Sequence, residues 1–473
     1  MMDTMLNQKG VSFKDLEQEI FRIICEIGRE LTEEILERYD QCLHDNRDRA
    51  VYRDKGKRSS TIKTIYGEVV YDRHVYQTRD EYGQNHCLYL LDEKLKLERI
   101  GLVSENCVEF LVSSITEMSY RNSAAKATEM TGLPISHTGV WNIVQKLGEK
   151  LEKDEEALVE AHEKGLLNGE KEAPVLFEEA DGVWLALQGK DRERRKFPKA
   201  EMKAAVCYDG WKDEGSGRTS LDGKVVTAGF EKAKVFQKKR EAMIASAYDL
   251  DETELRIMNG DGAAWIKKTV DKETVFQLDP FHRNKSIREN IGHPKAVKDV
   301  MELLEEEKAD EAIEYLKIYR DSLSNEEEII NAEKLIKYFT DNQEGLLPYK
   351  KRGISIPESP KGLSYRNMGT MENHIWSVIA RRMKHNHTSW SIRGGNHLAK
   401  ILAKKCSGKI YEVTEKLRIP MFEEEILGEI EGEVLSAGRI REKVGRGYEY
   451  PVIGKLVIGS AAVSGDGSFQ MFR

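Results

Sequence analysis

The spacing of apolar and polar residues changes several times along the chain, and each change predicts a new kind of element. Residues 12–45 repeat apolar side chains at helical spacing, which predicts one long amphipathic helix. Residues 61–90 have strand character instead, as in TIKTIYGEVVYDRHVYQ, with turns expected at Gly67 and at 79–85. Helical spacing returns over 105–150. The N-terminal part of the chain is therefore expected to mix helices and strands.

Two of the helices expected within 105–150 resemble a helix-turn-helix. The first can begin at Ser119, TGLPIS interrupts the pattern, and Ser136 can cap the second helix, HTGVWNIVQKLGEKL. Such a pair is typical of DNA-binding proteins, although any helical hairpin has the same pattern. The apolar face of the second helix consists of Val140, Ile143, Val144 and Leu147. The side chains that would then face DNA are His137, Thr138, Asn142, Gln145 and Lys146.

After a highly charged stretch at 150–173, expected to be a solvated helix and linker, the pattern becomes that of strands. Three strands are predicted at 175–187, 202–208 and 224–230, followed by a helix, a strand, a helix and a strand that ends at Leu278. Three strands followed by alternating helices and strands is the element order of the ribonuclease H-like fold. Residues 283–343 are helical and polar, so they are expected to be an insertion into that fold.

These patterns predict an α/β protein with a ribonuclease H-like (retroviral integrase-like) catalytic core that carries an all-α insertion. An α+β N-terminal region with a helix-turn-helix precedes the core. The expected divisions are 1–100 for the N-terminal helix and β-hairpin region, 101–172 for the DNA-binding helices and linker, 173–405 for the catalytic domain with its insertion at about 283–366, and 406–473 for a C-terminal tail.

Composition and charge narrow the class of protein. No run approaches the ~18 apolar residues of a membrane span, and the six cysteines are scattered, so we expect a cytoplasmic protein with reduced thiols. The net charge of −8 argues at first against a nucleic-acid partner. Residues 344–406, however, hold twelve basic and three acidic side chains. A chain that is acidic on average can still present such a basic stripe to phosphates.

Three acidic residues stand out by their positions. Asp181 interrupts the apolar alternation of the first predicted strand, where a charge is costly without a partner or a metal. Asp261 ends the fourth strand, between two glycines that permit close approach. Glu372 begins the predicted helix 370–384 and shares its apolar face. In a ribonuclease H-like fold the first and fourth strands are neighbours, so the three carboxylates would meet.

Carboxylate oxygens are the hard ligands that Mg²⁺ and Mn²⁺ prefer. Two such ions can activate a water or a 3′-hydroxyl and stabilise the leaving oxygen of a phosphodiester. The ordinary alternative is that these acids are solvated, as most of the 82 in this chain must be.

The surrounding motifs are more specific than the three acids. EEADGVWL, MNGDGAAWI, QLDPFHRNKSI and GTMENHIWSVIARRMK resemble the DDE-type transposases of bacterial insertion sequences, specifically the ISLre group, over roughly residues 10–405. The resemblance implies Asp181, Asp261 and Glu372 as metal ligands for two Mg²⁺ or Mn²⁺ ions. It also implies binding of terminal inverted repeats and target DNA, and a homo-oligomer in a synaptic complex.

The same resemblance implies a catalytic role for His282 and a supporting role for Asp279, because DPFH is similar to an element that follows the second aspartate in related Mutator-like transposases. The alternative is helix capping by Asp279 and a surface histidine. Three basic residues that follow Glu372 are expected to contact DNA phosphates, namely Arg381, Arg382 and Lys384. The protein is accordingly expected to associate with the nucleoid. A nuclease without strand transfer and an inactive, domesticated DNA-binding protein remain open.

Overall fold

The computed structural model describes residues 12–95, 103–132, 135–267, 274–369, 376–384 and 388–415. The described residues form two compact units, one of 12–95 with 131–132 and one of 103–130 with 135–415. The boundary expected near residue 100 coincides with this division. The boundary expected at 172 falls inside the second unit, so the helices at 103–163 and the predicted catalytic domain pack as one body.

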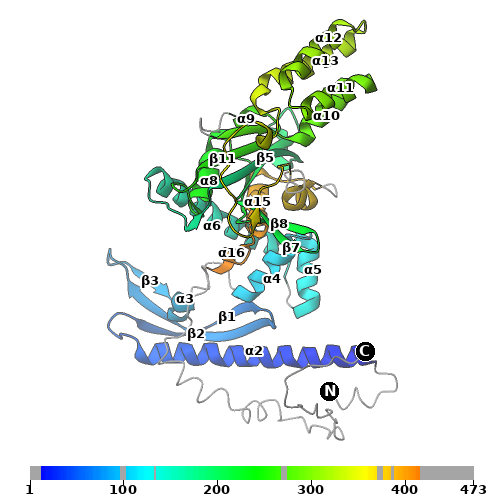
Figure 1. Cartoon of the computed structure of the whole chain (residues 1–473). Helices are drawn as coiled ribbons and strands as arrows, with labels where there is room; N and C mark the ends of the chain where they lie inside the picture. Colours follow the sequence, from blue (N-terminus) through cyan, green and yellow to red (C-terminus); the bar gives the residue numbers. More distant parts are fainter. Residues whose placement is uncertain are drawn as a thin grey trace, which may run out of the picture. The chain divides into compact units, whose positions relative to one another are not determined.

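The first unit packs one long helix on a small antiparallel sheet (Figure 1). Helix α2 (Phe13–Asn46) confirms the predicted helix and begins with a capping box between Ser12 and Asp15. The sheet has the order β1 (Arg53–Thr64), β2 (Gly67–Arg79) and β3 (Asn85–Leu88), and α3 (Leu90–Leu95) follows it. Strand β1 begins at Arg53, well before the predicted start at residue 61. The prediction missed its first residues because they are exposed and polar and lack the apolar alternation typical of strands. The core contains Leu36, Tyr39, Ile62, Val69, Tyr71 and Leu91.

The second unit begins with α4 (Glu105–Ile115), α5 (Tyr120–Thr131) and α6 (His137–Glu163). Ser136 caps α6 and its predicted apolar face is buried, as expected. The helix continues through the charged residues 150–163, in the stretch that was expected to be a solvated helix and linker. It packs against α8 (Ala233–Ala245) and α15 (Ile392–Cys406). Gly148 permits the contact with α15, since a Cβ there would lie 2.2 Å from the Cβ of His397.

A five-stranded sheet forms the centre of this unit. Its order is β12 (Val275–Leu278), β11 (Leu255–Gly260), β5 (Val175–Ala186), β6 (Lys199–Tyr208) and β9 (Val225–Gly229). The strands β5, β11 and β12 are parallel, whereas β6 is antiparallel to both β5 and β9. Each strand lies where the sequence pattern placed it. The expected adjacency of the first and fourth strands is also observed, as β5 pairs with β11 (Figure 1).

Helices fill the expected insertion. They are α10 (Pro280–Asn290), α11 (Pro294–Glu305), α12 (Ala309–Asp321) and α13 (Glu326–Asp341), followed by the 3-10 turns η2 (Gln343–Gly345) and η3 (Tyr349–Lys351). These helices share an apolar core that includes Val300, Leu316 and Phe339. Figure 1 shows them projecting together from the sheet. The insertion therefore forms a subdomain with its own core.

The remaining elements are short. They comprise β4 (Lys171–Glu172) paired with β10 (Tyr248–Asp249), a small sheet of β7 (Gly210–Gly215), β8 (Arg218–Asp222) and β13 (Leu363–Ser364), and the helices α7 (Gly189–Glu193), α9 (Ala264–Lys267) and α16 (Glu412–Glu415). The described part of the helix predicted at 370–384 is the π-helix η4 (Trp376–Lys384), and its Ile379 and Met383 are buried as expected. Among the helices in the described ranges, none is both long and apolar enough to cross a membrane.

Candidate active site

Three aspartates lie at one level of three adjacent parallel strands. Gly260 of β11 is paired with Ala180 of β5 on one side and with Leu278 of β12 on the other. The next residue is an aspartate in each case: Asp181 lies within β5, Asp261 directly follows β11 and Asp279 directly follows β12. Neighbouring strands are about 4.8 Å apart, so this register gathers the three carboxylates at one edge of the sheet. Asp181 and Asp261, predicted as partners, are thus brought together.

Asp181 is the carboxylate most affected by its surroundings. Its side chain is only 17% exposed, and its Oδ1 accepts a hydrogen bond from the amide of Gly182 at 2.7 Å. Burial raises the pKa of Asp181 to about 6; His282 opposes this rise, and Asp261 and Asp279 add to it. A partly buried carboxylate beside other carboxylates is the electrostatic setting that a divalent cation relieves.

Asp261 is held by the turn that follows β11. Its Oδ1 accepts a hydrogen bond from the amide of Ala263 at 2.8 Å, and the hydroxyl of Tyr338 on α13 donates to its backbone carbonyl at 2.8 Å. Gly262 has a φ of +86°, which disfavours other residues there. Tyr338 belongs to the helical insertion, so the insertion helps to fix the position of Asp261. The sequence pattern had not identified Tyr338.

Asp279 and His282 form a pair that reaches toward Asp181. Asp279 caps α10 by accepting the backbone amide of His282, and it also accepts a hydrogen bond from Nδ1 of the His282 ring, both at 3.1 Å. Nε2 of the ring lies 4.0 Å from Oδ2 of Asp181. The alternative expectation of helix capping by Asp279 is therefore confirmed, and the same carboxylate also orients the His282 ring. The hydrogen bond to Asp279 raises the pKa of His282.

A second polar row, one that the sequence pattern had missed, supports the aspartates. Glu179, Asn259 and Gln277 are paired across the same three strands, two residues before the aspartates. All three are buried. Nδ2 of Asn259 donates to Oε2 of Glu179 at 3.1 Å and to Oδ2 of Asp279 at 2.9 Å. Although burial opposes it, hydrogen bonds from His282 and Asn259 hold the pKa of Asp279 below its usual range.

Glu372, the third expected ligand, lies outside the described residues. The chain three residues before it is anchored at the site. The amide of Gly369 donates to Oε2 of Glu179 at 3.1 Å, and a Cβ at Gly369 would lie 3.8 Å from Oδ2 of Asp279. Its φ of +120° favours glycine.

The donors present suit a hard divalent ion. Asp181 and Asp261 each use Oδ1 for a backbone amide, which orients Oδ2 as the remaining ligand oxygen. These oxygens are the type that Mg²⁺ and Mn²⁺ bind. Within the described residues they do not form, with a third side chain, a group close enough to share one ion. A complete centre therefore needs a further ligand or water.

The residues expected to read DNA on α6 are divided by the structure. His137, Thr138, Asn142 and Lys146 are exposed. Gln145 is buried, and its Oε1 accepts a hydrogen bond from Nδ1 of His397 at 2.8 Å. The expectation for Gln145 was therefore wrong. The apolar face of α6 is wider than the sequence suggested, because α15 covers it as well.

Part of the expected basic stripe is buried or paired with acids. Arg382 is buried, donates from Nε to the carbonyl of Ile115 at 2.6 Å, and lies over the rings of Tyr120 and Trp390. It cannot contact a phosphate in this position. Arg381 pairs with Glu117, whereas Lys384 is exposed.

The basic residues of the following helix, α15, are likewise paired with acids from other elements. These pairs are Arg393 with Glu149, Lys400 with Glu155 and Glu231, Lys404 with Glu412, and Lys405 with Glu117. The positive charge of α15 is therefore offset by acids from elsewhere in the chain, whereas Lys350, Lys361, Arg366 and Lys384 are exposed. Two of these acids, Glu149 and Glu155, come from α6, and Glu155 lies in the stretch 150–173 that was expected to be solvated.

Comparison with known proteins places most of the chain in one family. Residues 6–417 match UPF0236, described as an uncharacterised protein family. A UPF0236 protein of Caldanaerobacter subterraneus subsp. tengcongensis is 26% identical over 86% of this chain and 82% of its own. A second from that strain, also 26% identical, carries a name that joins eleven locus designations. A Streptococcus gallolyticus relative, named for the vanSb 3′ region, is 22% identical over 84% of each chain.

Proposed function

The chain belongs to the UPF0236 family, and we propose that it is a DNA transposase of the DDE type, similar to those of ISLre insertion sequences. The observation that carries the proposal is the row of Asp181, Asp261 and Asp279 on adjacent parallel strands. Remote carboxylates at one sheet edge are the arrangement that metal-dependent cleavage and joining of phosphodiesters require. Asp181, Asp261 and Glu372 are the proposed metal ligands.

The strand order supports a ribonuclease H-like core. Three antiparallel strands, β5, β6 and β9, are followed by β11 and β12, which lie parallel to β5 on its other side. This order makes the first strand the neighbour of the fourth, and it is the order from which the convergence of the acids was predicted. The core would be interrupted by the helical insertion, which begins directly after Asp279.

Covalent geometry is compatible with Glu372 as the third ligand. Gly369 is held beside Glu179 and Asp279, and three residues of chain span at most about 11 Å.

Two bound divalent ions would supply activation of a water or 3′-hydroxyl and stabilisation of the leaving oxygen. The side chains of the chain itself would position them. Asp181 and Asp261 offer their Oδ2 atoms. Asn259 donates a hydrogen bond to the side chain of Glu179, which in turn accepts the backbone amide of Gly369. His282, held through Nδ1 by Asp279, faces the carboxylate of Asp181 with Nε2. A protonated His282 there can donate to a phosphate oxygen of the DNA.

The names of the relatives agree with a mobile element. Three of the Caldanaerobacter names join eleven, four and two loci of one strain. Repeated copies within one genome are what transposition produces. DNA ends and target DNA would then be the partners of this chain, in a synaptic homo-oligomer at the nucleoid. The exposed residues His137, Thr138, Asn142 and Lys146 of α6 remain the proposed DNA contacts of the helical region.

The test uses the full chain, Mg²⁺, a plasmid target and duplexes that carry the DNA ends flanking the coding sequence. We expect covalent joining of the duplex to the plasmid, dependent on Mg²⁺. Asp261→Asn should abolish joining and leave end binding largely intact, because Asn retains the oxygen that accepts the Ala263 amide. The exposed Asp251, changed to Asn, is the matched control.

The outcomes separate the proposal from its alternatives. Mg²⁺-dependent cleavage without joining would indicate a nuclease. Retarded DNA without any chemistry would indicate a DNA-binding protein. Normal joining by the Asp261→Asn variant would remove this carboxylate from the mechanism.

A further inference from the structure

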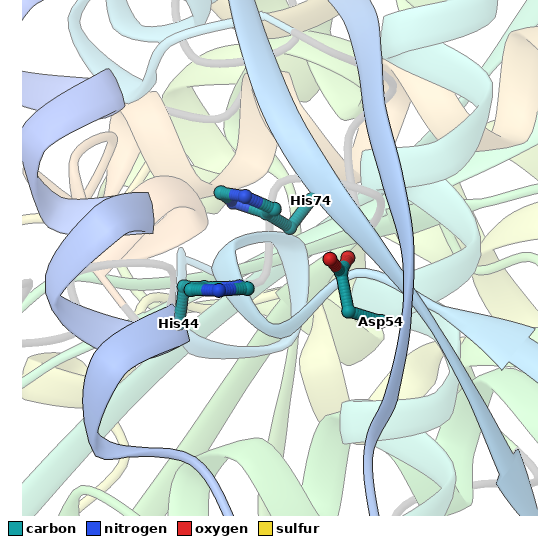
Figure 2. A group of neighbouring side chains, drawn as sticks. All are labelled: His44, Asp54 and His74. Atoms are coloured by element: carbon teal, nitrogen blue, oxygen red, sulfur yellow. The ribbon is translucent and has the colours of Figure 1, made fainter. Parts of the chain in front are cut away.

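The first unit contains a second cluster of potential metal ligands. His44 of α2, Asp54 of β1 and His74 of β2 each offer a ligand atom, and these atoms all lie within 4.8 Å of one another. Figure 2 shows the two imidazole rings facing each other, with the Asp54 carboxylate beside them. The ring centroids of His44 and His74 are 4.0 Å apart. Three separate elements therefore converge on one point.

His74 is oriented by a carboxylate on its far side. Nδ1 of His74 donates to Oδ2 of Asp40 at 2.5 Å, which leaves Nε2 as the ring's ligand atom. Asp40 is fully buried and also accepts the backbone amide of His74 at 3.0 Å. Metal-bound histidines commonly donate their other ring nitrogen to a carboxylate in this way. Oδ1 of Asp40 is buried with no hydrogen-bond partner among the described residues, which a nearby cation would offset.

The other two side chains are also aimed by their surroundings. Asp40 and His44 are four residues apart on one face of α2. Nδ1 of His44 lies 3.3 Å from the hydroxyl of Tyr76, which orients the ring.

Asp54 sits at an irregularity of β1. The pairing of β1 with β2 shifts between Asp54 and Lys57, and Gly56 within the shift has a φ of +86°. Its amide donates to Oδ1 of Asp54 at 3.0 Å. Bulges commonly redirect a side chain next to a functional site. Here the shift separates Asp54, paired with Tyr76, from the regular ladder that follows it.

We propose that His44, His74 and Asp54 bind one late first-row divalent cation of the Zn²⁺ class, which clips α2 to the hairpin of β1 and β2. Two imidazoles and one carboxylate suit such borderline ions better than Mg²⁺. A tetrahedral zinc with bonds of 2.0–2.1 Å spaces its ligands about 3.4 Å apart. The ligand atoms lie within 4.8 Å of one another, and the stacked rings would turn so that both nitrogen lone pairs point at the ion. Three protein ligands leave a fourth position for water.

The test measures Zn²⁺ bound by untagged full-length protein after treatment with chelator and reloading. The background carries Asp261→Asn and Cys87→Ser, which removes a proposed Mg²⁺ ligand and an exposed thiol. We expect one tightly bound Zn²⁺ per chain in the presence of excess Mg²⁺, and a higher melting temperature with Zn²⁺ than without it. Bound Co²⁺ should show the visible absorption bands of a tetrahedral site with nitrogen and oxygen ligands.

Single substitutions then locate the ion. His44→Gln and Asp54→Asn should each abolish stoichiometric binding and the Zn²⁺-dependent rise in melting temperature. Neither side chain is fully buried, so both variants should fold. His86→Gln, at an exposed histidine of β3, should bind like the parent. Absence of bound Zn²⁺ in the parent, or unchanged binding in both ligand variants, would overturn the proposal. Because Asp261 is already replaced, the result does not depend on the transposase assignment.

Discussion

Replacing Asp181 by Asn should make the metal-free protein more stable while it destroys the proposed site. The Asp181 carboxyl has a pKa of about 6 in the folded chain, against an ordinary value of 3.8. Below pH 3.8 the carboxyl is protonated in both the folded and the unfolded state, so it does not change the free energy of unfolding. As the pH rises toward 6, the unfolded state loses its proton first, so folding is progressively penalised. Above pH 6 the penalty is complete.

The size of the effect follows from the shift. About two pKa units at ~1.4 kcal/mol each give a penalty of up to about 3 kcal/mol at pH 8, and about 1 kcal/mol at pH 4.5. Asn removes the charge but keeps the oxygen that accepts the Gly182 amide. Asp181→Asn should therefore stabilise the metal-free chain by about 3 kcal/mol at pH 8 and by much less at pH 4.5.

Tryptophan fluorescence during urea unfolding measures this effect selectively. All six tryptophans lie in the second unit, so the signal does not report on the first. The experiment compares the parent, Asp181→Asn and the exposed control Asp251→Asn in EDTA at both pH values. Added Mg²⁺ should stabilise the parent more than Asp181→Asn. An Asp181→Asn variant no more stable than the parent at pH 8, or a gain equal at both pH values, would refute the reasoning.

Two further substitutions test how the second unit is packed. Gly148→Ala should lower the free energy of unfolding by about 1–3 kcal/mol, despite the better helix propensity of Ala, because its Cβ would meet His397 at 2.2 Å; unchanged urea unfolding would mean that α15 moves away easily. Arg382→Met should lower the free energy of unfolding by about 1–3 kcal/mol, because the hydrogen bond to the carbonyl of Ile115 is lost. The salt dependence of DNA binding should stay unchanged. A flatter salt slope would show that Arg382 contacts phosphate after all.

Much of the fold could be predicted because the relevant signals are local. The periodicity of 12–45 was sufficient for α2, and alternation located β5, β6, β9, β11 and β12. Asp181 and Asp261 could be singled out for the same reason, since a charge in an apolar strand and a Gly-Asp-Gly strand end are visible in a short window. Their adjacency followed from the order of the elements.

The properties that involve several elements were decided by the tertiary structure. Register alone aligned Asp279 with the other two aspartates and placed Glu179 and Asn259 beneath them. A local count of charge could not reveal that Lys400 is buried between Glu155 and Glu231. The cluster of His44, Asp54 and His74 likewise required a helix and two strands to meet. Local patterns determine which elements form, because they depend on backbone period. Which side chains share an environment depends on contacts between residues far apart in the chain, and only the packed structure specifies those.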